Sequence, residues 1–152
     1  MTKISPFQPE NQAAVQALIL AGLEEHWGFL DESLNPDLKD IAASYEKGVF
    51  LVAWEDGAII GTGAYLPHAS DTVEIVRMSV SKHKRRQGIG CQILVELCNQ
   101  AYQNGYQKAI LETTATWQKV ISFYQAFCFQ ITLYTDGDVY FALDLQAYFE
   151  AK

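Results

Sequence analysis

The chain has 152 residues, of which 49% are hydrophobic and 19% charged, with a formal net charge of −7. This composition predicts one globular domain over residues 1–152, long enough to bury about two-thirds of the surface of its unfolded chain. No apolar run approaches the length of about 18 residues that a membrane span needs, and no signal pattern opens the chain, so we expect a cytoplasmic protein. The acidic balance disfavours nucleic acid and anionic membranes as partners.

The first half of the chain predicts short strands and two helices. A helix from Pro9–Glu10 has apolar residues at helical spacing and a stop signal at Gly28. Asp56-Gly57 separates two apolar runs, which predicts a β-hairpin. In chain order, we expect a strand over 4–7, a helix over 9–28, a short helix over 37–45, and strands over 49–54, 58–66 and 73–80.

The second half continues with an amphipathic helix over 91–104, a strand over 108–114 and a last helix over 120–129. Thr116 is a candidate N-cap of that last helix, and Thr114 would serve as well. Strands over 129–134 and 139–143 then form a hairpin around Asp136-Gly137. The order β-α-α-β-β-β-α-β-α-β-β indicates a mixed α/β domain with helices on both faces of its sheet. The buried stripe of the amphipathic helix is expected to consist of Ile89, Ile93, Leu94, Leu97, Ala101 and Tyr102.

The cysteines and histidines do not predict a metal site. Cys91, Cys98 and Cys128 are odd in number and lack the spacing of metal ligands. The three histidines are scattered along the chain. We therefore expect reduced thiols and no bound metal.

The most informative motif is Arg85-Arg86-Gln87-Gly88-Ile89-Gly90, which joins the strand over 73–80 to the amphipathic helix. Glycine lets a backbone approach a ligand closely, and the first N–H groups of a helix have no partners of their own. The helix dipole and two arginines add positive charge at the same point. The turn therefore predicts a site for a multiply charged anion such as a pyrophosphate. The competing interpretation is a basic loop that only caps a helix.

Other glycine-rich motifs fit this turn less well. A P-loop ends in Gly-Lys-Ser/Thr, whereas Gly90 is followed by Cys91-Gln92. A dinucleotide-binding fingerprint needs a third small residue where this chain has Ile93. Both alternatives are therefore disfavoured.

Arg85, Gly88 and Gly90 match, position by position, the acetyl-CoA-binding motif Gln/Arg-x-x-Gly-x-Gly/Ala of the GNAT superfamily of N-acetyltransferases. The chain resembles this family well over residues 47–145, because the segment 120–129 is also similar to the family's last helix, Ala-x-x-Phe/Leu-Tyr-x-x-x-Gly-Phe. The resemblance implies a GNAT-like acyl-CoA N-acyltransferase fold, in which helices flank a central mixed, mostly antiparallel sheet. It also implies that acetyl-CoA is the co-substrate and that its acetyl group passes directly to a primary amine of a small molecule or peptide.

The resemblance further implies how acetyl-CoA would be bound. The backbone of Met78, Ser79 and Val80 would hold the pantetheine arm, and the N–H of Val80 would polarise the thioester carbonyl. Thr114 is a further candidate for pantetheine, through its hydroxyl, with helix capping as the competing interpretation. The pyrophosphate would lie against Arg85, Arg86, Gln87, Gly88, Ile89, Gly90 and Cys91.

Two residues are candidates for acid–base chemistry. By strand alternation Glu74 shares a face with Met78 and Val80, an unusual place for a carboxylate, and it matches the position of the glutamate base in some family members. A structural ion pair, for example with Arg77, is the competing interpretation. Tyr124 falls on the family's tyrosine that protonates the departing thiolate, although without the resemblance core packing would be expected.

The chain departs from the family pattern after the last helix and leaves its acceptor open. Cys128 stands where the family usually has glycine, so we expect a different turn there. The acceptor site is expected on the first two helices, their connection and the loop before Glu74. A non-catalytic acetyl-CoA sensor and a purely structural domain are competing functions, and a homodimer is an option because dimers are common for this fold. The candidate acceptor residues are Glu24, Glu25, Trp27, Phe29, Asp31, Tyr45 and His68, whose acids and aromatics suit an ammonium group.

Overall fold

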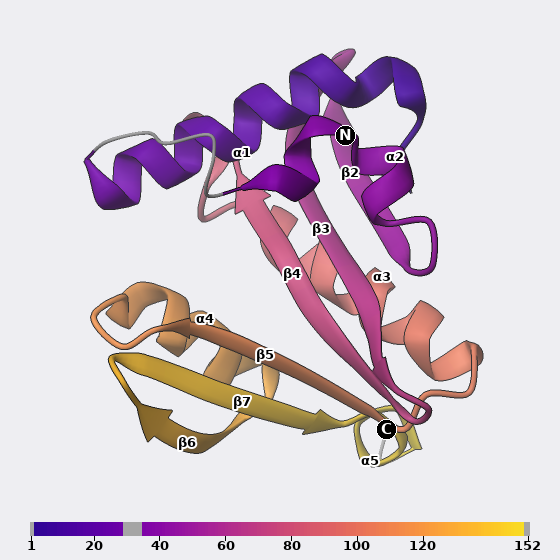
Figure 1. Cartoon of the computed structure of the whole chain (residues 1–152), viewed down its shortest axis with the longest axis vertical. Helices are drawn as coiled ribbons and strands as arrows, with labels where there is room; N and C mark the ends of the chain where they lie inside the picture. The colour runs from indigo at the N-terminus through magenta and orange to yellow at the C-terminus, as the bar shows by residue number, and fades with distance from the viewer. Residues whose placement is uncertain (1, 29–34, 151–152) are drawn as a thin grey trace. The chain divides into compact units, whose positions relative to one another are not determined.

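The structure is a computed structural model that describes residues 2–28 and 35–150 (Figure 1). Within these ranges seven strands form one hydrogen-bonded sheet in the order β1-β2-β3-β4-β5-β7-β6. The chain forms two compact units, defined by Met1–Leu66 with Val76–Leu97 and by Pro67–Ile75 with Cys98–Lys152. No helix in the described ranges is long and apolar enough to cross a membrane.

The first unit begins with a strand and a long helix, as predicted. The helix α1 ends at Gly28, whose left-handed backbone (φ 76°) lets its N–H donate to the carbonyl of Glu24 at 2.8 Å. The short helix predicted over 37–45 is instead two pieces, because Asp40 has a non-helical backbone (φ −145°, ψ 87°) and its side chain accepts the N–H of Ala43 at 3.2 Å as a helix cap. The elements of this unit are β1 (Lys3–Pro6), η1 (Pro9–Asn11), α1 (Gln12–Trp27), η3 (Pro36–Lys39), α2 (Ile41–Ser44), β2 (Val49–Glu55), η4 (Lys82–Lys84) and the larger parts of β3 (Ala58–Ala69), β4 (Thr72–Val80) and α3 (Ile89–Gln103).

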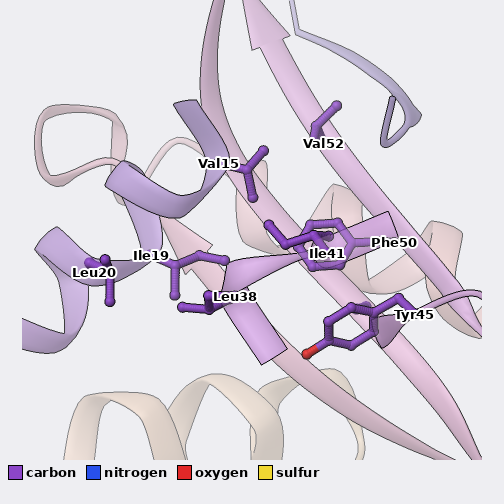
Figure 2. Close-up of a cluster of buried hydrophobic side chains, with 9 residues drawn as sticks. Val15, Ile19, Leu20, Leu38, Ile41, Tyr45, Phe50 and Val52 are labelled. Atoms are coloured by element: carbon purple, nitrogen blue, oxygen red, sulfur yellow. The ribbon is translucent and has the colours of Figure 1, made fainter. Parts of the chain in front are cut away.

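One face of the first unit's strands is covered by α1, η3 and α2. Figure 2 shows side chains from these helices and from β2 packed against one another. Gln12 fixes this arrangement, because its Nε2 donates to the carbonyl of Leu38 at 2.6 Å and its Oε1 accepts the N–H of Ile41 at 3.0 Å. The buried residues of this α1-side cluster are Val15, Ile19, Leu20, Leu38, Ile41, Tyr45, Phe50, Val52 and Ala64.

The opposite face packs against α3 through a glycine on β3. A Cβ atom placed on Gly63 would lie 2.5 Å from Cγ2 of Ile93, 2.6 Å from the sulfur of Met78 and 3.0 Å from Cδ1 of Leu97. Any other residue would therefore push α3 away from the strand. The predicted stripe of α3 is buried, except that Tyr102 is half-buried.

The second unit contains the C-terminal hairpin of β6 and β7 together with the helices α4 and α5. β4 pairs in parallel with β5, and β7 pairs antiparallel with both β5 and β6. Tyr124 of α4 packs edge-on against Phe129. The centroid of its ring lies 5.7 Å from the ring centroid of Phe129 and 5.7 Å from that of Phe141. Its elements are β5 (Lys108–Thr114), α4 (Gln118–Phe127), β6 (Gln130–Thr135), β7 (Asp138–Asp144) and α5 (Leu145–Glu150), with the remaining parts of β3, β4 and α3.

Two features at the ends of this unit were not predicted. The helix α5 follows β7 directly, and Glu150 accepts the hydroxyl of Tyr102 at 2.6 Å. The strand β6 ends the strand order and carries two exposed apolar side chains, Leu133 at 53% and Tyr134 at 61% exposure.

The threonine caps predicted for α4 are wrong. Its N-cap is Trp117, whose side chain makes no capping hydrogen bond, while the N–H of Trp117 donates to the carbonyl of Thr114 at 3.1 Å. The backbone of Thr114 therefore takes part in the turn before the helix. Its hydroxyl remains a candidate ligand of pantetheine.

The turn after α4 keeps the usual left-handed geometry although Cys128 replaces glycine, so the different turn that we expected is not found. Cys128 has φ 97°, its N–H donates to the carbonyl of Gln125 at 3.0 Å, and the N–H of Phe129 donates to the carbonyl of Tyr124 at 3.0 Å. A residue with a Cβ atom is strained in this conformation. The hydrogen bonds and the buried ring of Phe129 hold the strained residue in place.

Replacing Cys128 with glycine should stabilise the protein by about 1 kcal/mol, because the left-handed strain disappears. For a chain of this size, thermal unfolding should then show a rise in Tm of about 2–4 °C. Cys128→Ala is the matched control, since alanine loses the thiol but keeps the Cβ atom and the strain. Equal Tm values for the two variants would contradict the assignment of strain to this residue.

Candidate functional site

The turn between β4 and α3 has the geometry that the sequence predicts. The N–H of Gln92 donates to the carbonyl of Gly88 at 3.0 Å, so the preceding amides at the start of α3 have no partner within the helix. Gly88 has φ 82°, and no atom of the described residues lies within 4 Å of a Cβ atom placed on it. Ile89 is buried and anchors the start of the helix. The turn therefore presents an open, glycine-lined cradle at a helix N-terminus, which suits an anion.

The two arginines of this cradle have different environments. The guanidinium of Arg85 donates to both carboxylate oxygens of Glu25 on α1, at 2.7 and 2.9 Å, and its Nε donates to the carbonyl of Val80 at 3.0 Å. Arg86 is exposed and has a left-handed backbone with φ 65°. Arg85 therefore joins α1 to the end of β4, while Arg86 is the more accessible cation. Gln87 and Cys91 are exposed as well, and Gly90 is half-buried.

The end of β4 does not follow the regular alternation that we expected. Arg77 has φ 55°, and its side chain and that of Val76 both lie on the α1 side, against Asp37 and the α1-side cluster respectively. The sulfur of Met78 lies on the opposite side, against α3. The prediction that one face continues from Glu74 to Met78 is therefore wrong, because the left-handed residue interrupts the pleat.

The residues that follow this interruption, Met78, Ser79 and Val80, are half-buried. Ser79 faces α1, because a Cβ atom placed on Gly22 would lie 3.2 Å from its hydroxyl oxygen. β4 ends where the N–H of Ser81 donates to the carbonyl of Ile60 at 2.8 Å. The strand backbone over 78–80 thus leads directly into the cradle.

Glu74, Thr114 and Tyr124 belong to the second unit, whereas the cradle belongs to the first. Glu74 is half-buried and pairs with Ile110 in the register of β4 and β5. Glu112 lies two residues further along β5, opposite Tyr140 on β7. A hydrogen bond with Asp138, partial burial and the negative charges of Asp138 and Glu74 raise the pKa of Glu112. The predicted base therefore shares its strand face with further carboxyl groups.

Glu112 and Asp138 are a feature that reasoning from the sequence missed. Glu112 follows the buried Leu111 in β5, and Asp138 precedes the buried Val139 in β7, one residue before the strand that the sequence predicts. Their proximity depends on the pairing of β5 with β7, in which Thr114 opposes Asp138 and Glu112 opposes Tyr140. Knowledge of that register would have brought them together.

Tyr124 is held by aromatic packing and remains protonated. Its side chain is 6% exposed and contacts the rings of Phe123, Phe129 and Phe141. Burial raises the pKa of Tyr124, and the neighbouring Cys98 acts in the same direction. Burial also raises the pKa of the Cys98 thiol, to about 12. Both groups are therefore neutral around pH 7, which suits a proton donor at position 124.

The candidate acceptor residues have different surroundings. Tyr45 is buried, and its hydroxyl donates to Asp37 at 2.5 Å, so this side chain belongs to the core of the first unit. Glu25 pairs with Arg85, and Trp27 is exposed. His68 is exposed near the end of β3. Phe29 and Asp31 lie outside the described residues.

Comparison with known proteins decides the family. Residues 13–129 match the model described as the acetyltransferase (GNAT) family. The chain belongs to this family. A GNAT-family acetyltransferase of Staphylococcus aureus has the same fold, with a TM-score of 0.88, 18% identity, and coverage of 95% of this chain and 99% of that one. The PaiA N-acetyltransferase of Thermoplasma acidophilum, solved in complex with coenzyme A, gives a TM-score of 0.82 at 14% identity and covers 95% of this chain and 99% of that one.

Curated relatives are similar to this chain in sequence. N-acetyltransferase family 8 member 2 of Rattus norvegicus is 32% identical over 111 residues, which are 68% of this chain and 49% of the relative. The N-acetylaspartate synthetase of Homo sapiens is 32% identical over 106 residues, or 67% of this chain and 35% of that protein. This GNAT chain thus spans about half or less of the length of these two relatives.

Replacing Gly88 with glutamate should abolish acetyl-CoA binding, with an affinity loss of about 100-fold or more, because the new side chain fills the cradle and adds a negative charge. Gly57→Glu is the matched control. Gly57 is an exposed turn glycine of the same unit with φ 80° and equally open surroundings. Calorimetric titration of both variants measures the difference. Micromolar affinity in the Gly88→Glu protein would contradict the placement of the site.

Proposed function

We propose that this protein is an N-acetyltransferase that binds acetyl-CoA at the β4–α3 turn and transfers its acetyl group to a primary amine. The observation that carries the proposal is the open turn around Gly88 at the N-terminus of α3, next to the exposed Arg86. Its backbone amides and positive charge fit a pyrophosphate, and among residues 2–28 and 35–150 no atom lies within 4 Å of the point where Gly88 would carry a Cβ atom. Membership of the GNAT family and the coenzyme A complex of the PaiA neighbour support the same ligand.

The reaction requires a neutral amine and a stabilised oxyanion. An alkylammonium group has a pKa near 10.4, so only about one molecule in a thousand is the free base at neutral pH. In the proposed mechanism Glu74 accepts the amine proton, directly or through a water molecule. The N–C bond then forms and the C–S bond breaks. An N–H of the strand backbone over 78–80 would stabilise the oxyanion, and Tyr124 would give its proton to the departing thiolate.

The proposed acceptor is a primary amine of a small molecule or peptide. The proposed location of the enzyme itself is the cytoplasm. The accessible acidic and aromatic side chains among the candidate residues support a cationic acceptor, because an ammonium group is attracted both by carboxylates and by aromatic faces. Glu24 and Trp27 at the end of α1 are exposed. Glu112 and Asp138 add carboxyl groups on the strand face of Glu74.

Titration of the purified protein with acetyl-CoA, with ATP and NAD as controls, tests the cradle. We expect selective binding in the micromolar range, followed by acceptor-dependent thiol release when a panel of amines is added. Binding without turnover across the panel would favour a non-catalytic acetyl-CoA sensor. Absence of binding would overturn both the enzyme and the sensor.

Tyr124→Phe should lower kcat about ten-fold or more while the affinity for acetyl-CoA stays the same, because the ring is kept and only the proton donor is lost. Glu74→Gln should also lower kcat without weakening acetyl-CoA binding. The matched control is Tyr134→Phe, since Tyr134 is an exposed tyrosine of β6. An unchanged kcat in Tyr124→Phe would remove Tyr124 from the mechanism.

The pH profile gives a second measurement for Tyr124. Because its pKa is raised above the ordinary value of 10.0, the phenol keeps its proton at every pH below that value. In the wild-type enzyme, deprotonation of Tyr124 should therefore cause no fall in kcat between about pH 8 and 10. Tyr124→Phe should lower the plateau of kcat plotted against pH, without shifting the pH at which kcat falls on the alkaline side. A limb in this range that disappears in the variant would contradict the assignment.

A further inference from the structure

The left-handed backbone of Arg77 is unusual for its place in a strand. Its φ of 55° lies in the region that residues with a Cβ atom avoid, yet it stands inside β4. This conformation places Val76 and Arg77 on one side and Met78 on the other. It therefore decides in which direction the following amides point.

The side chain of Arg77 is clamped by the segment that follows α1. Its Nε donates to Oδ2 of Asp37 at 2.9 Å, and its Nη2 donates to Oδ1 of Asp37 at 2.6 Å and to Oδ1 of Asn35 at 3.1 Å. The Arg77 and Asp37 side chains are only 19% and 28% exposed. A two-pronged contact between a planar guanidinium and a carboxylate fixes orientation as well as distance.

Two further hydrogen bonds complete the clamp. The hydroxyl of Tyr45 donates to Oδ2 of Asp37 at 2.5 Å, and Tyr45 is itself packed in the α1-side cluster (Figure 2). On the backbone side, the hydroxyl of the buried Thr62 donates to the carbonyl of Arg77 at 2.8 Å. The strained residue is therefore held at its guanidinium and at its carbonyl, by elements of the same unit.

The clamp is charged under ordinary conditions. Burial alone would raise the pKa of Asp37, but the hydrogen bonds from Arg77 and Tyr45 and the charge of Arg77 outweigh it and lower that pKa. The interaction is thus present above the ordinary pKa of an aspartate and is lost only as the pH falls through the lowered value. At neutral pH the pair holds its full charge.

We propose that Arg77 and Asp37 are positioning residues, which hold the left-handed turn so that the amides of residues 78–80 face the acetyl thioester. This inference rests on the proposed function. Neither side chain needs to touch the co-substrate, because the pair acts through the backbone conformation of β4. A purely structural ion pair would contribute to stability alone, whereas a positioning pair also contributes to the polarisation of the thioester.

Two substitutions of Arg77 separate these roles. Arg77→Ala and Arg77→Gly both remove the guanidinium, but only glycine adopts a φ of 55° without strain. In a positioning role, kcat of the alanine variant should fall about ten-fold or more, and the glycine variant should recover most of that loss. In a purely structural role, the two variants should show the same kcat at temperatures below their Tm.

A second pair of variants tests the clamp from the other side. Asp37→Ala should lower kcat in the wild-type background and have little further effect in the Arg77→Gly background, because the turn no longer depends on the clamp there. Ser5→Ala is the control. It removes the hydrogen bond that Nε1 of Trp54 donates to the Ser5 hydroxyl at 2.9 Å in the same unit, and it should leave kcat unchanged. Additive effects of Asp37→Ala and Arg77→Gly would overturn the proposal.

A spectroscopic measurement does not depend on knowing the best acceptor. The infrared carbonyl stretch of bound ¹³C-labelled acetyl-CoA should shift to lower frequency in the wild type and in Arg77→Gly, and less in Arg77→Ala. Thermal unfolding of each variant verifies that it is folded. Identical shifts in the alanine and glycine variants would overturn the inference. If the wild-type protein neither binds acetyl-CoA nor releases thiol, the proposed function itself has failed, which is a different result.

Discussion

The close approach of α3 to β3 is the constraint on which the cradle depends. Gly63 leaves room for Ile93 and Leu97, so the helix lies directly on the strand and its buried stripe packs without a gap. Since α3 begins immediately after the Arg85–Gly88 turn, its position also fixes where the unpartnered amides of its first turn lie. The absence of a side chain at Gly63 on β3 thereby sets the geometry of the proposed anion site at the N-terminus of α3.

Most of the fold follows from local signals in the sequence. Alternating apolar runs and Asp-Gly turns predict β2, β3, β6 and β7 within one to three residues, and helical spacing predicts α1 and α3. The resemblance of residues 120–129 to the family's last helix predicts α4. The errors occur at the ends of helices, where the sequence signals for a helix start or stop are weak or conflict with one another. The helix expected over 37–45 is divided at Asp40, which caps α2, and α5 follows β7 without a loop that would have marked its start. The threonine caps of α4 are absent because Trp117 occupies the cap position.

The parts of the candidate site that the sequence could not predict are pairs of residues far apart in the chain. The motif predicts the cradle and its glycines, yet Arg85 has Glu25 as its partner, 60 residues away, and Arg77 has Asp37. The pairing of Glu112 with Asp138 likewise requires the register of two strands. Alternation also placed Glu74 and Met78 on one face, because no local signal marks a left-handed arginine inside a strand. Local patterns therefore predict where the loops of this site lie in the sequence, whereas the partners of their side chains depend on contacts between residues far apart in the chain.

The partnership of Arg85 with Glu25 has a consequence for the kinetics of ligand capture. The protein carries a net charge of −7, so at long range its field repels a polyanion. Attraction arises only near the basic run from Lys82 to Arg86, and Glu25 offsets part of it. Dissolved ions screen charges further apart than about 8–10 Å at physiological salt, so they suppress the distant repulsion more than the short-range attraction. We therefore expect this acidic protein to capture an anionic ligand at least as fast at physiological salt concentration as at low salt concentration.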